Sequence, residues 1–186
     1  LADLGQSLAV QAQRYAATPL AGRTWLQHAT PVTLGMKIAG WLGAVTRSRQ
    51  RLQELKPRLL VLQFGGASGT LAALGEQAMP IAQALSEELQ LTLPDQPWHT
   101  QRDRVVEFGS VLGLIAGSLG KMGRDISLLM QTEAAEVFEP SAPGKGGSST
   151  MPHKRNPVGA AVLISAATRV PGLLSTLFSA MPQEHE

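Results

Sequence analysis

The sequence predicts an all-α protein built as a bundle of long helices. Hydrophobic residues make up 44% of the 186 residues, yet aromatic residues make up only 4%. Alanine, leucine and glycine therefore carry most of the apolar content, which favours closely packed helices over a β sandwich. The longest periodic run, residues 101–132, spaces its apolar side chains three and four residues apart, as long helices packed at a shallow angle require.

Shorter periodic stretches predict the other helices. Residues 1–17 carry apolar side chains on one stripe, and Thr18-Pro19 is predicted to end that helix. Residues 34–55 carry a second stripe. We expect Lys56-Pro57 to end this second helix, because the residue before a proline is restricted to extended conformations.

The remaining helices are predicted on either side of the long run. Residues 76–91 predict a shorter helix whose inward face holds Ile81, Leu85 and Leu89. Residues 158–181 return to apolar spacing and predict the last helix. The segment from Thr18 to Thr33, between the first two helices, is interpreted as a connecting loop.

The run 101–132 carries two packing seams side by side. The large apolar seam is Val105, Phe108, Leu112, Ile115, Leu119, Met122, Ile126 and Leu129. The small seam is Gly109, Gly113, Ala116, Gly120 and Gly123. Each glycine costs about 1 kcal/mol of helix propensity relative to alanine, so close packing must offset that cost. A chain of this size rarely needs to bury one helix on two sides by itself. We therefore infer that the helix packs in the core of a helical oligomer.

Charge and composition exclude several classes of protein. Sixteen basic and fourteen acidic residues give a net charge of +2, too weak and too mixed for a nucleic-acid-binding stripe. The chain has no cysteine, and its four histidines are scattered, so no metal-ligand spacing is present. The most apolar run, residues 111–119, is too short to span a membrane. We expect a protein of the cytoplasm.

One stretch, residues 144–157, carries the chemistry that the rest of the chain lacks; we call it the signature loop. Its first half is rich in glycine and hydroxyl groups, whereas its second half holds two prolines, a lysine, an arginine and an asparagine. No Asp or Glu lies between Glu139 and Glu184, so the local positive field suits a small anionic ligand. We expect residues 143–150 to be mobile without ligand. A connecting surface loop is the simpler alternative.

The order of residues in Gly147–Pro157, GSSTMPHKRNP, resembles the signature of the fumarase/aspartase superfamily at nearly every position. That resemblance implies that Ser148 is the catalytic base and that Lys154 and Asn156 hold a substrate carboxylate. It also implies that Ser149 and Met151 contact substrate. Removing a proton next to a carboxylate places a second negative charge on it, and a lysine, a carboxamide and loop amides stabilise that charge.

Residues 22–31, within the predicted loop, resemble a second active-site region of the same superfamily. Many members carry Thr-His there, followed two residues later by Gln, whereas this chain has Thr24, Trp25 and Gln27. We expect these three side chains to bind substrate. Trp25 in place of the histidine is similar to the muconate cycloisomerase branch and argues against a lyase that needs the imidazole. The alternative is that Trp25 is a packing residue of the loop.

The resemblance sets the remaining expectations. It implies that residues 1–186 form a single central helical-bundle domain, without the N-terminal segment and the C-terminal domain of the family. It implies a cycloisomerase of aromatic catabolism that acts on a small tricarboxylate with no metal or organic cofactor. It also implies a homotetramer whose active sites are shared between subunits, with no nucleic-acid or membrane partner. Two alternatives stay open: a β-elimination lyase, adenylosuccinate lyase first, and a non-catalytic helical scaffold.

Overall fold

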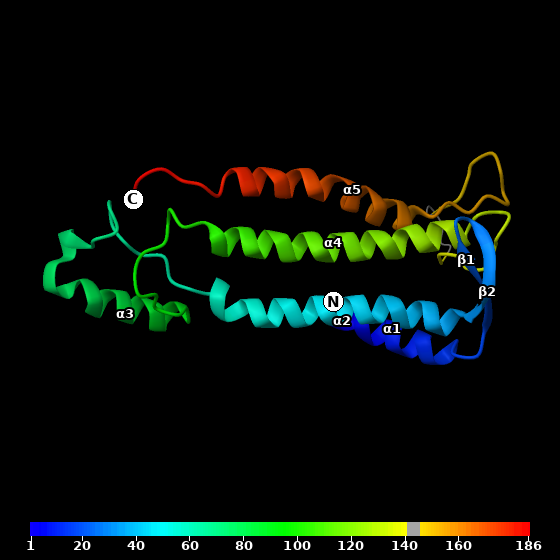
Figure 1. Ribbon diagram of the computed structural model, residues 1–186, viewed down its shortest axis with the longest axis horizontal. Coiled ribbons are helices and arrows are strands. Elements are labelled where there is room, and N and C mark those ends of the chain that lie inside the picture. The colour runs from blue at the N-terminus through cyan, green and yellow to red at the C-terminus, as the bar shows by residue number, and fades with distance from the viewer. Residues whose placement is uncertain (141–145) are drawn as a thin grey trace. The chain divides into compact units, whose positions relative to one another are not determined.

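A computed structural model describes residues 1–140 and 146–186, and it confirms the mostly helical prediction. The helices are α1 (Ala2–Arg14), α2 (Leu34–Leu59), the 3₁₀ helix η1 (Ala72–Gln77), α3 (Ala78–Leu89), α4 (Asp103–Leu129) and α5 (Val158–Ser179). The strands β1 (Pro19–Thr24) and β2 (Gln27–Thr33) form a small antiparallel sheet (Figure 1).

The chain divides into two compact units. Unit 1 comprises residues 1–50 and 113–171, and unit 2 comprises residues 51–112 and 172–186. The helices α2, α4 and α5 each contribute residues to both units. The hairpin and the signature loop both belong to unit 1, so the geometry of the predicted site can be described within that unit.

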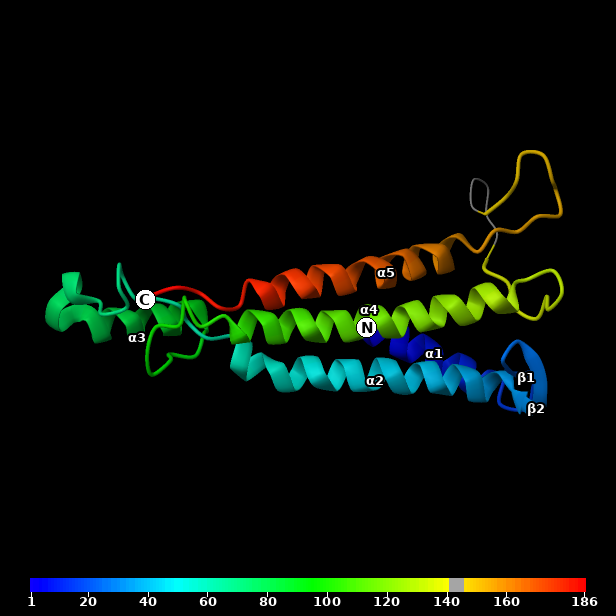
Figure 2. The same cartoon turned by 45° about the horizontal axis from the view of Figure 1, so that its top comes forward.

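The core of unit 1 forms where α1, α2 and α4 meet. Its buried side chains are Leu8 of α1, Ile38 and Val45 of α2, and Met122 of α4. Leu4, Ala12, Tyr15, Leu34, Trp41, Leu42, Leu119 and Ile126 pack around them. Figures 1 and 2 both show α1 beside the first part of α2. Burying each large apolar side chain stabilises the fold by about 1.5–3 kcal/mol, and the helical stripes predicted these contacts correctly.

A polar contact ties α2 to α4 beside this core. The indole Nε1 of Trp41 donates a hydrogen bond of 2.8 Å to Oδ2 of Asp125. Lys121, one turn earlier on α4, is ion-paired with the other carboxylate oxygen of Asp125. Only 8% of Asp125 is exposed, and a buried carboxylate is tolerated when such donors satisfy it.

The small seam of α4 receives α5 within the same chain. A Cβ added at Gly120 would lie 2.2 Å from Cβ of Ala167, and one added at Gly123 would lie 2.8 Å from the carbonyl oxygen of Ala160. The seam therefore lets another helix approach closely, as predicted. At Gly120 and Gly123 that helix is α5 of the same chain, whereas the sequence predicted a second subunit. The large seam is buried in unit 1 at Met122 and Leu129, whereas Leu112 in unit 2 is exposed.

Residues 18–33 form a hairpin where the sequence indicated a loop. Thr24 pairs with Gln27, so Trp25 and Leu26 make a two-residue turn, and both have positive φ, 51° and 61°. Two positive φ angles are typical of a type I′ turn, whose usual Asn-Gly signal is absent here. Trp25 is 97% exposed, so the alternative that it is a packing residue is wrong for this chain.

Two further details differ from the sequence prediction. Helix α2 continues through Pro57 to Leu59, because a proline in the last turn removes only one intrahelical hydrogen bond. Helix α3 buries Ala82 and Ser86, whereas Ile81 and Leu89, both predicted to face inward, are exposed and Leu85 is half-buried. Small residues allow close packing on that face, and Ser86 Oγ donates 2.6 Å to the carbonyl of Leu91.

Helices α4 and α5 are each long and apolar enough to cross a membrane, by length and composition alone. Their most apolar windows have mean hydropathies of 1.4 and 1.5, with 22% and 0% of the residues buried. The prediction from the sequence, that the most apolar run is too short to span a membrane, considered residues 111–119 only. Helices that pack against others in a water-soluble bundle have the same composition, so this finding marks apolar surface and does not by itself indicate a membrane.

An ion pair joins the hairpin to the segment that follows α4. The guanidinium of Arg23 on β1 meets the carboxylate of Glu136 at 2.6 and 3.0 Å. The hydrogen bond from Arg23, with a smaller one from the backbone N–H of Ala21, holds the pKa of the Glu136 carboxyl below its ordinary value. The irregularity of the β ladder between Ala21 and Arg23 lies at the same place.

We predict that Glu136→Gln lowers the free energy of unfolding at neutral pH. We also predict that the stability of this variant falls less than that of the wild type when the pH is lowered. Because the folded pKa of Glu136 is lowered, its contribution is present above the unfolded pKa and disappears as pH falls through the folded pKa. The pair is partly exposed, so the loss is about 0.2–1 kcal/mol. Urea unfolding at pH 7 and pH 3 measures it. Glu133→Gln is the control, because Glu133 has no ion pair among the described residues. Equal effects of both variants at both pH values would contradict the prediction.

We also predict that Gly120→Leu destabilises the packing of α5 on α4 by about 1–3 kcal/mol or more, because the new side chain overlaps Ala167. Gly117→Ala on the same helix is the control, since a Cβ there meets nothing within 4 Å. The control is expected to stabilise the helix by up to about 1 kcal/mol. Urea unfolding compares the two, and an unchanged midpoint for Gly120→Leu would show that the helices do not pack this way.

Candidate active site

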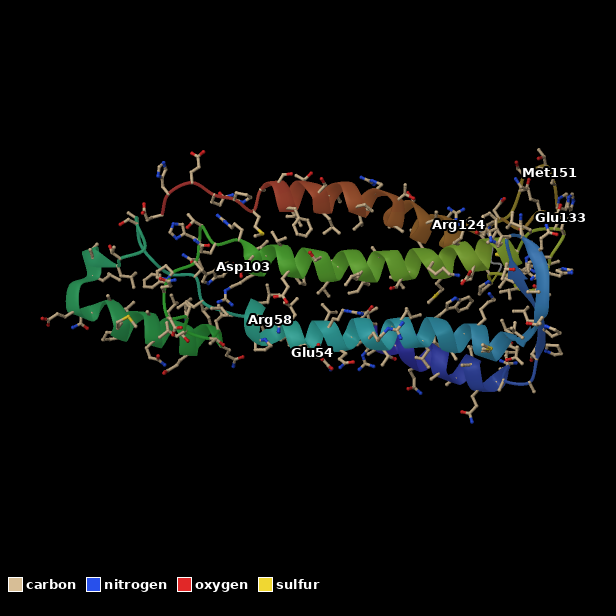
Figure 3. All side chains as sticks on the ribbon, in the orientation of Figure 1. Glu54, Arg58, Asp103, Arg124, Glu133 and Met151 are labelled. Carbon is tan, nitrogen blue, oxygen red and sulfur yellow. The ribbon has the colours of Figure 1, made fainter. Side chains whose placement is uncertain are left out.

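The signature loop leaves the end of unit 1 that carries the hairpin. Figures 1 and 2 show both at that end, and Met151 of the loop is labelled there in Figure 3. Residues 141–145 lie outside the described residues, so the predicted mobility of residues 143–145 and the position of Lys145 are not addressed. The described part of the loop, residues 146–157, holds every signature residue that the sequence singled out.

Ser148 sits in a small cradle of hydrogen-bond donors. Its Oγ accepts a hydrogen bond of 3.1 Å from the backbone N–H of Met151 and a longer one of 3.4 Å from that of Thr150. The hydroxyl of Thr150 is also 3.4 Å away. Backbone N–H groups directed at an oxygen stabilise it when it becomes negatively charged. The local turn alone therefore favours the alkoxide form that a serine base needs.

Asn156 closes the loop on itself. Its backbone N–H donates 2.7 Å to the carbonyl of Gly146, and its Nδ2 lies 3.4 Å from the carbonyl of Gly147. Gly146 has φ of +70°, and a Cβ there would lie 2.9 Å from the carbonyl oxygen of Asn156. Glycine is therefore required at 146 for both its conformation and its space. These contacts bring the carboxamide of Asn156 to the start of the Ser148 turn.

Lys154 offers a charged group at the surface of the loop. Its backbone N–H donates 3.0 Å to the carbonyl of Met151, which closes a turn over Met151–Lys154. Its side chain is exposed and has no carboxylate partner among the described residues. Ser149 and Met151 are exposed as well. The loop thus presents an unneutralised ammonium group close in sequence to the Ser148 cradle.

Glu139 and Arg155 fix the base of the loop. The two carboxylate oxygens of Glu139 accept hydrogen bonds of 2.9 and 2.7 Å from the N–H groups of Gly159 and Ala160, in the first turn of α5. Such a cap stabilises a helix by about 0.5–2 kcal/mol. The guanidinium of Arg155 donates 2.8 Å to the carbonyl of Glu139 and lies 4.4 Å from the ring centroid of Phe138. Arg155 is thus engaged in the loop base.

Sequence reasoning missed the role of Glu139. Glu139 lies in a short acidic stretch, residues 133–139, and is 20 and 21 residues away from the two N–H groups that it caps. A helix cap is normally sought at the residue just before the helix, which here is a proline. The available signal was the absence of Ser, Thr or Asp immediately before α5, which left its N–H donors to be satisfied from elsewhere.

The hairpin residues form a separate group. Thr24 and Gln27 flank the exposed turn, and Trp25 is its first residue. Within the described part of the chain no hydrogen bond links these three residues to the signature residues. The structure therefore brings the predicted site residues together as two clusters at one end of unit 1. It does not join them into a single pocket.

A cavity of about 890 Å³ in unit 1 lies between the hairpin and the facing sides of α2 and α4. Its polar lining includes Arg23, Thr24, Thr30, Lys37, Trp41 and Lys121. Thr24 is the one predicted site residue on its wall. In the described part of the chain, no three His, Asp or Glu side chains gather in a way that could hold a metal ion.

Comparison with known proteins identifies the chain's relatives. A family model described as lyase matches residues 1–172. The 3-carboxy-cis,cis-muconate cycloisomerase of Pseudomonas aeruginosa is 80% identical over all of this chain, which covers 40% of that protein, and that of Pseudomonas putida is 77% identical with 44% covered. The crystal structure of the 3-carboxy-cis,cis-muconate lactonizing enzyme from Pseudomonas putida matches with a TM-score of 0.93 at 83% identity, over 98% of this chain and 41% of that one.

The chain spans about two fifths of the length of these relatives. The family model that it matches is described as lyase, which agrees with the resemblance of its signature loop. The family match extends over both compact units, so it does not depend on the loop alone. The chain therefore belongs to the lyase family of the fumarase/aspartase superfamily.

Proposed function

We propose that the full-length protein is a 3-carboxy-cis,cis-muconate cycloisomerase, which closes carboxymuconate to 4-carboxymuconolactone in the catabolism of protocatechuate. The observation that carries this proposal is the 80% identity to such an enzyme over the whole chain. The geometry adds support, because Ser148 lies in a cradle of amides and Lys154 offers a free cation in the same loop.

The reaction is intramolecular and needs a site for a developing negative charge. One carboxylate of the substrate adds its oxygen to a C=C bond that a second carboxylate activates. The electron pair of that bond moves into the second carboxylate, which becomes an enediolate, and a proton then reaches the adjacent carbon. Lys154 and the carboxamide of Asn156 stabilise the enediolate, and Ser148 handles the proton. Asn156 exchanges its weak 3.4 Å contact with Gly147 for the substrate.

The hairpin side chains are proposed to bind the far part of the substrate. Thr24, Trp25 and Gln27 are exposed at the turn, and Trp25 offers a large apolar surface in place of an imidazole. Ser149 and Met151 complete the contacts from the loop. A tryptophan cannot shuttle a proton, which favours a cycloisomerase over adenylosuccinate lyase. A non-catalytic scaffold has no need of the Ser148 cradle. The reaction as proposed uses no metal or organic cofactor.

Assembly into a homotetramer is part of the proposal. Helix α5 exposes apolar side chains along its length, namely Val158, Val162, Leu173 and Phe178. Its hydroxyl groups donate to its own backbone, as Thr168 does to Ile164 at 2.8 Å and Thr176 to Gly172 at 3.2 Å. Because these groups are already satisfied, α5 can be buried by another subunit at little polar cost.

A shared active site follows from the same proposal. The two clusters of site residues, at the hairpin and in the signature loop, are not joined within this chain, so a partner subunit is proposed to bring a complementary cluster to each. The assembled protein is proposed to work in the cytoplasm, without nucleic-acid or membrane partners.

The signature residues provide the test of function. Purified full-length protein is assayed by absorbance with carboxymuconate and with adenylosuccinate, and turnover of the first alone is expected. Ser148→Ala should lower kcat by about 10²–10⁴-fold with little change in KM, because it removes the proton-transfer group but keeps the cation. Lys154→Met should damage both constants, because the ammonium meets substrate and enediolate.

Ser127→Ala and Lys56→Met are the matched controls, since both positions lie outside the loop and the hairpin. Turnover of adenylosuccinate would favour the lyase alternative, and activity on neither substrate would favour the scaffold. If Ser148→Ala retains a kcat close to that of the wild type, Ser148 is not the proton-transfer residue.

Light scattering tests assembly. Val162→Asp places a charge on the exposed face of α5 and should shift the full-length protein from tetramer towards smaller species, because a buried unpaired charge is costly. Val10→Asp on α1, the same substitution at a residue that is 55% exposed, should leave the mass unchanged. A wild-type protein that is monomeric at micromolar concentration would contradict the proposed assembly.

A further inference from the structure

The start of α5 is held differently from the other helix starts. Helices α1 and α3 have no side-chain cap, and α2 is capped locally, by Thr33 Oγ1 accepting 3.1 Å from the N–H of Met36. Helix α5 is capped by Glu139, from the far side of the signature loop. The carboxylate of Glu139, which precedes the signature loop in the sequence, therefore contacts the helix that follows the loop.

The cap lies next to Asn156 and so bears on the position of that residue. Asn156 lies two residues before Val158, the first residue of α5, and its carbonyl accepts 2.9 Å from the N–H of Val158. Arg155 adds a second tie from the loop to the backbone of Glu139, at 2.8 Å. A shift of the α5 start relative to Glu139 would therefore disturb Asn156 and Arg155, and Lys154 is the residue just before them. Ser148 is linked to the same frame through the pairing of Gly146 with Asn156.

We propose that Glu139 is a positioning residue for the proposed reaction: its carboxylate clamps the first turn of α5 and thereby fixes Lys154 and Asn156 against Ser148. The inference rests on the proposed function. Both oxygens of Glu139 are occupied by N–H donors, at 2.9 and 2.7 Å, so this carboxylate acts through the loop and not on the substrate. A negative charge at the N-terminus of a helix also interacts favourably with the helix dipole.

The clamp has a built-in space requirement. A Cβ at Gly159 would lie 3.2 and 3.3 Å from the two carboxylate oxygens of Glu139, which is closer than ordinary contact. A side chain at 159 would therefore push the carboxylate from its donors without removing it. Gly172, further along the same helix, has open space around its Cβ position and provides a matched control.

Hydrogen exchange tests the clamp directly, without reference to activity. In the full-length wild-type protein, the amides of Gly159 and Ala160 are expected to exchange more slowly than in Glu139→Ala. Their exchange rates in Glu133→Ala are expected to equal those of the wild type. Glu133 belongs to the same acidic segment but makes no hydrogen bond in the described part of the chain. Equal exchange of the two amides in wild type and Glu139→Ala would overturn the clamp.

Kinetics on carboxymuconate test the positioning role. Glu139→Gln keeps one acceptor and should lower kcat by up to about 10²-fold, the size expected when reacting groups shift by about 1 Å. Gly159→Ala should act in the same direction, while Gly172→Ala and Glu133→Gln should leave kcat unchanged. In a Ser148→Ala background the Glu139→Gln change should lower kcat by a smaller factor than in the wild type, because the alignment of Lys154 and Asn156 against Ser148 loses its effect when Ser148 is removed.

The outcomes separate the two proposals. Active wild type with unchanged kinetics in Glu139→Gln and Gly159→Ala overturns the positioning role and leaves the proposed function standing. Additive losses in the Ser148→Ala background also overturn it, because they indicate general destabilisation. Wild-type protein that does not turn over carboxymuconate overturns the proposed function and the catalytic consequence together, whereas slow exchange at Gly159 and Ala160 would still support the clamp itself.

Discussion

The close approach of α5 to α4 in unit 1 is the constraint on which the candidate site depends. Gly120 and Gly123 leave room for Ala167 and Ala160, and a side chain at either glycine would collide with α5. Residues 130–157, which include the signature loop, connect α4 to α5, so the separation of these two helices sets the distance that this segment must bridge. The glycines of the seam cost helix propensity, and the close packing of α5 against them offsets that cost.

Within that frame, the loop holds its own residues with short local contacts. Gly146 and Asn156 pair backbone to backbone, Ser148 collects two amide donors, and Glu139 with Arg155 secures the base. Three loop side chains therefore have distinct tasks: Arg155 organises the base of the loop, Lys154 is free for a ligand, and Ser148 accepts hydrogen bonds from two backbone amides. This division supports chemistry at an anionic substrate, since the free charge and the activated oxygen are left for the ligand.

The exposed residues of unit 1 give a second, consistent pattern. Trp25 lies in a strained turn with almost all of its surface in solvent, and Val162 on α5 is also largely exposed. Large apolar surface that a chain leaves uncovered is typical of protein interfaces. The hairpin cluster and the loop cluster are separate here, and the proposed assembly would give each of them a partner.

The sequence by itself determined the helices, the seams on residues 101–132 and the identity of the signature residues, because periodicity and a long ordered motif are local properties. It failed at Trp25-Leu26, since a two-residue turn with positive φ is normally signalled by Asn or Gly, and at α3, where short side chains pack inward. Glu139 capping α5 and Arg23 pairing with Glu136 were decided only by the tertiary structure. Both contacts join residues far apart in sequence, and no local pattern encodes which distant donor a carboxylate will meet once the helices have packed.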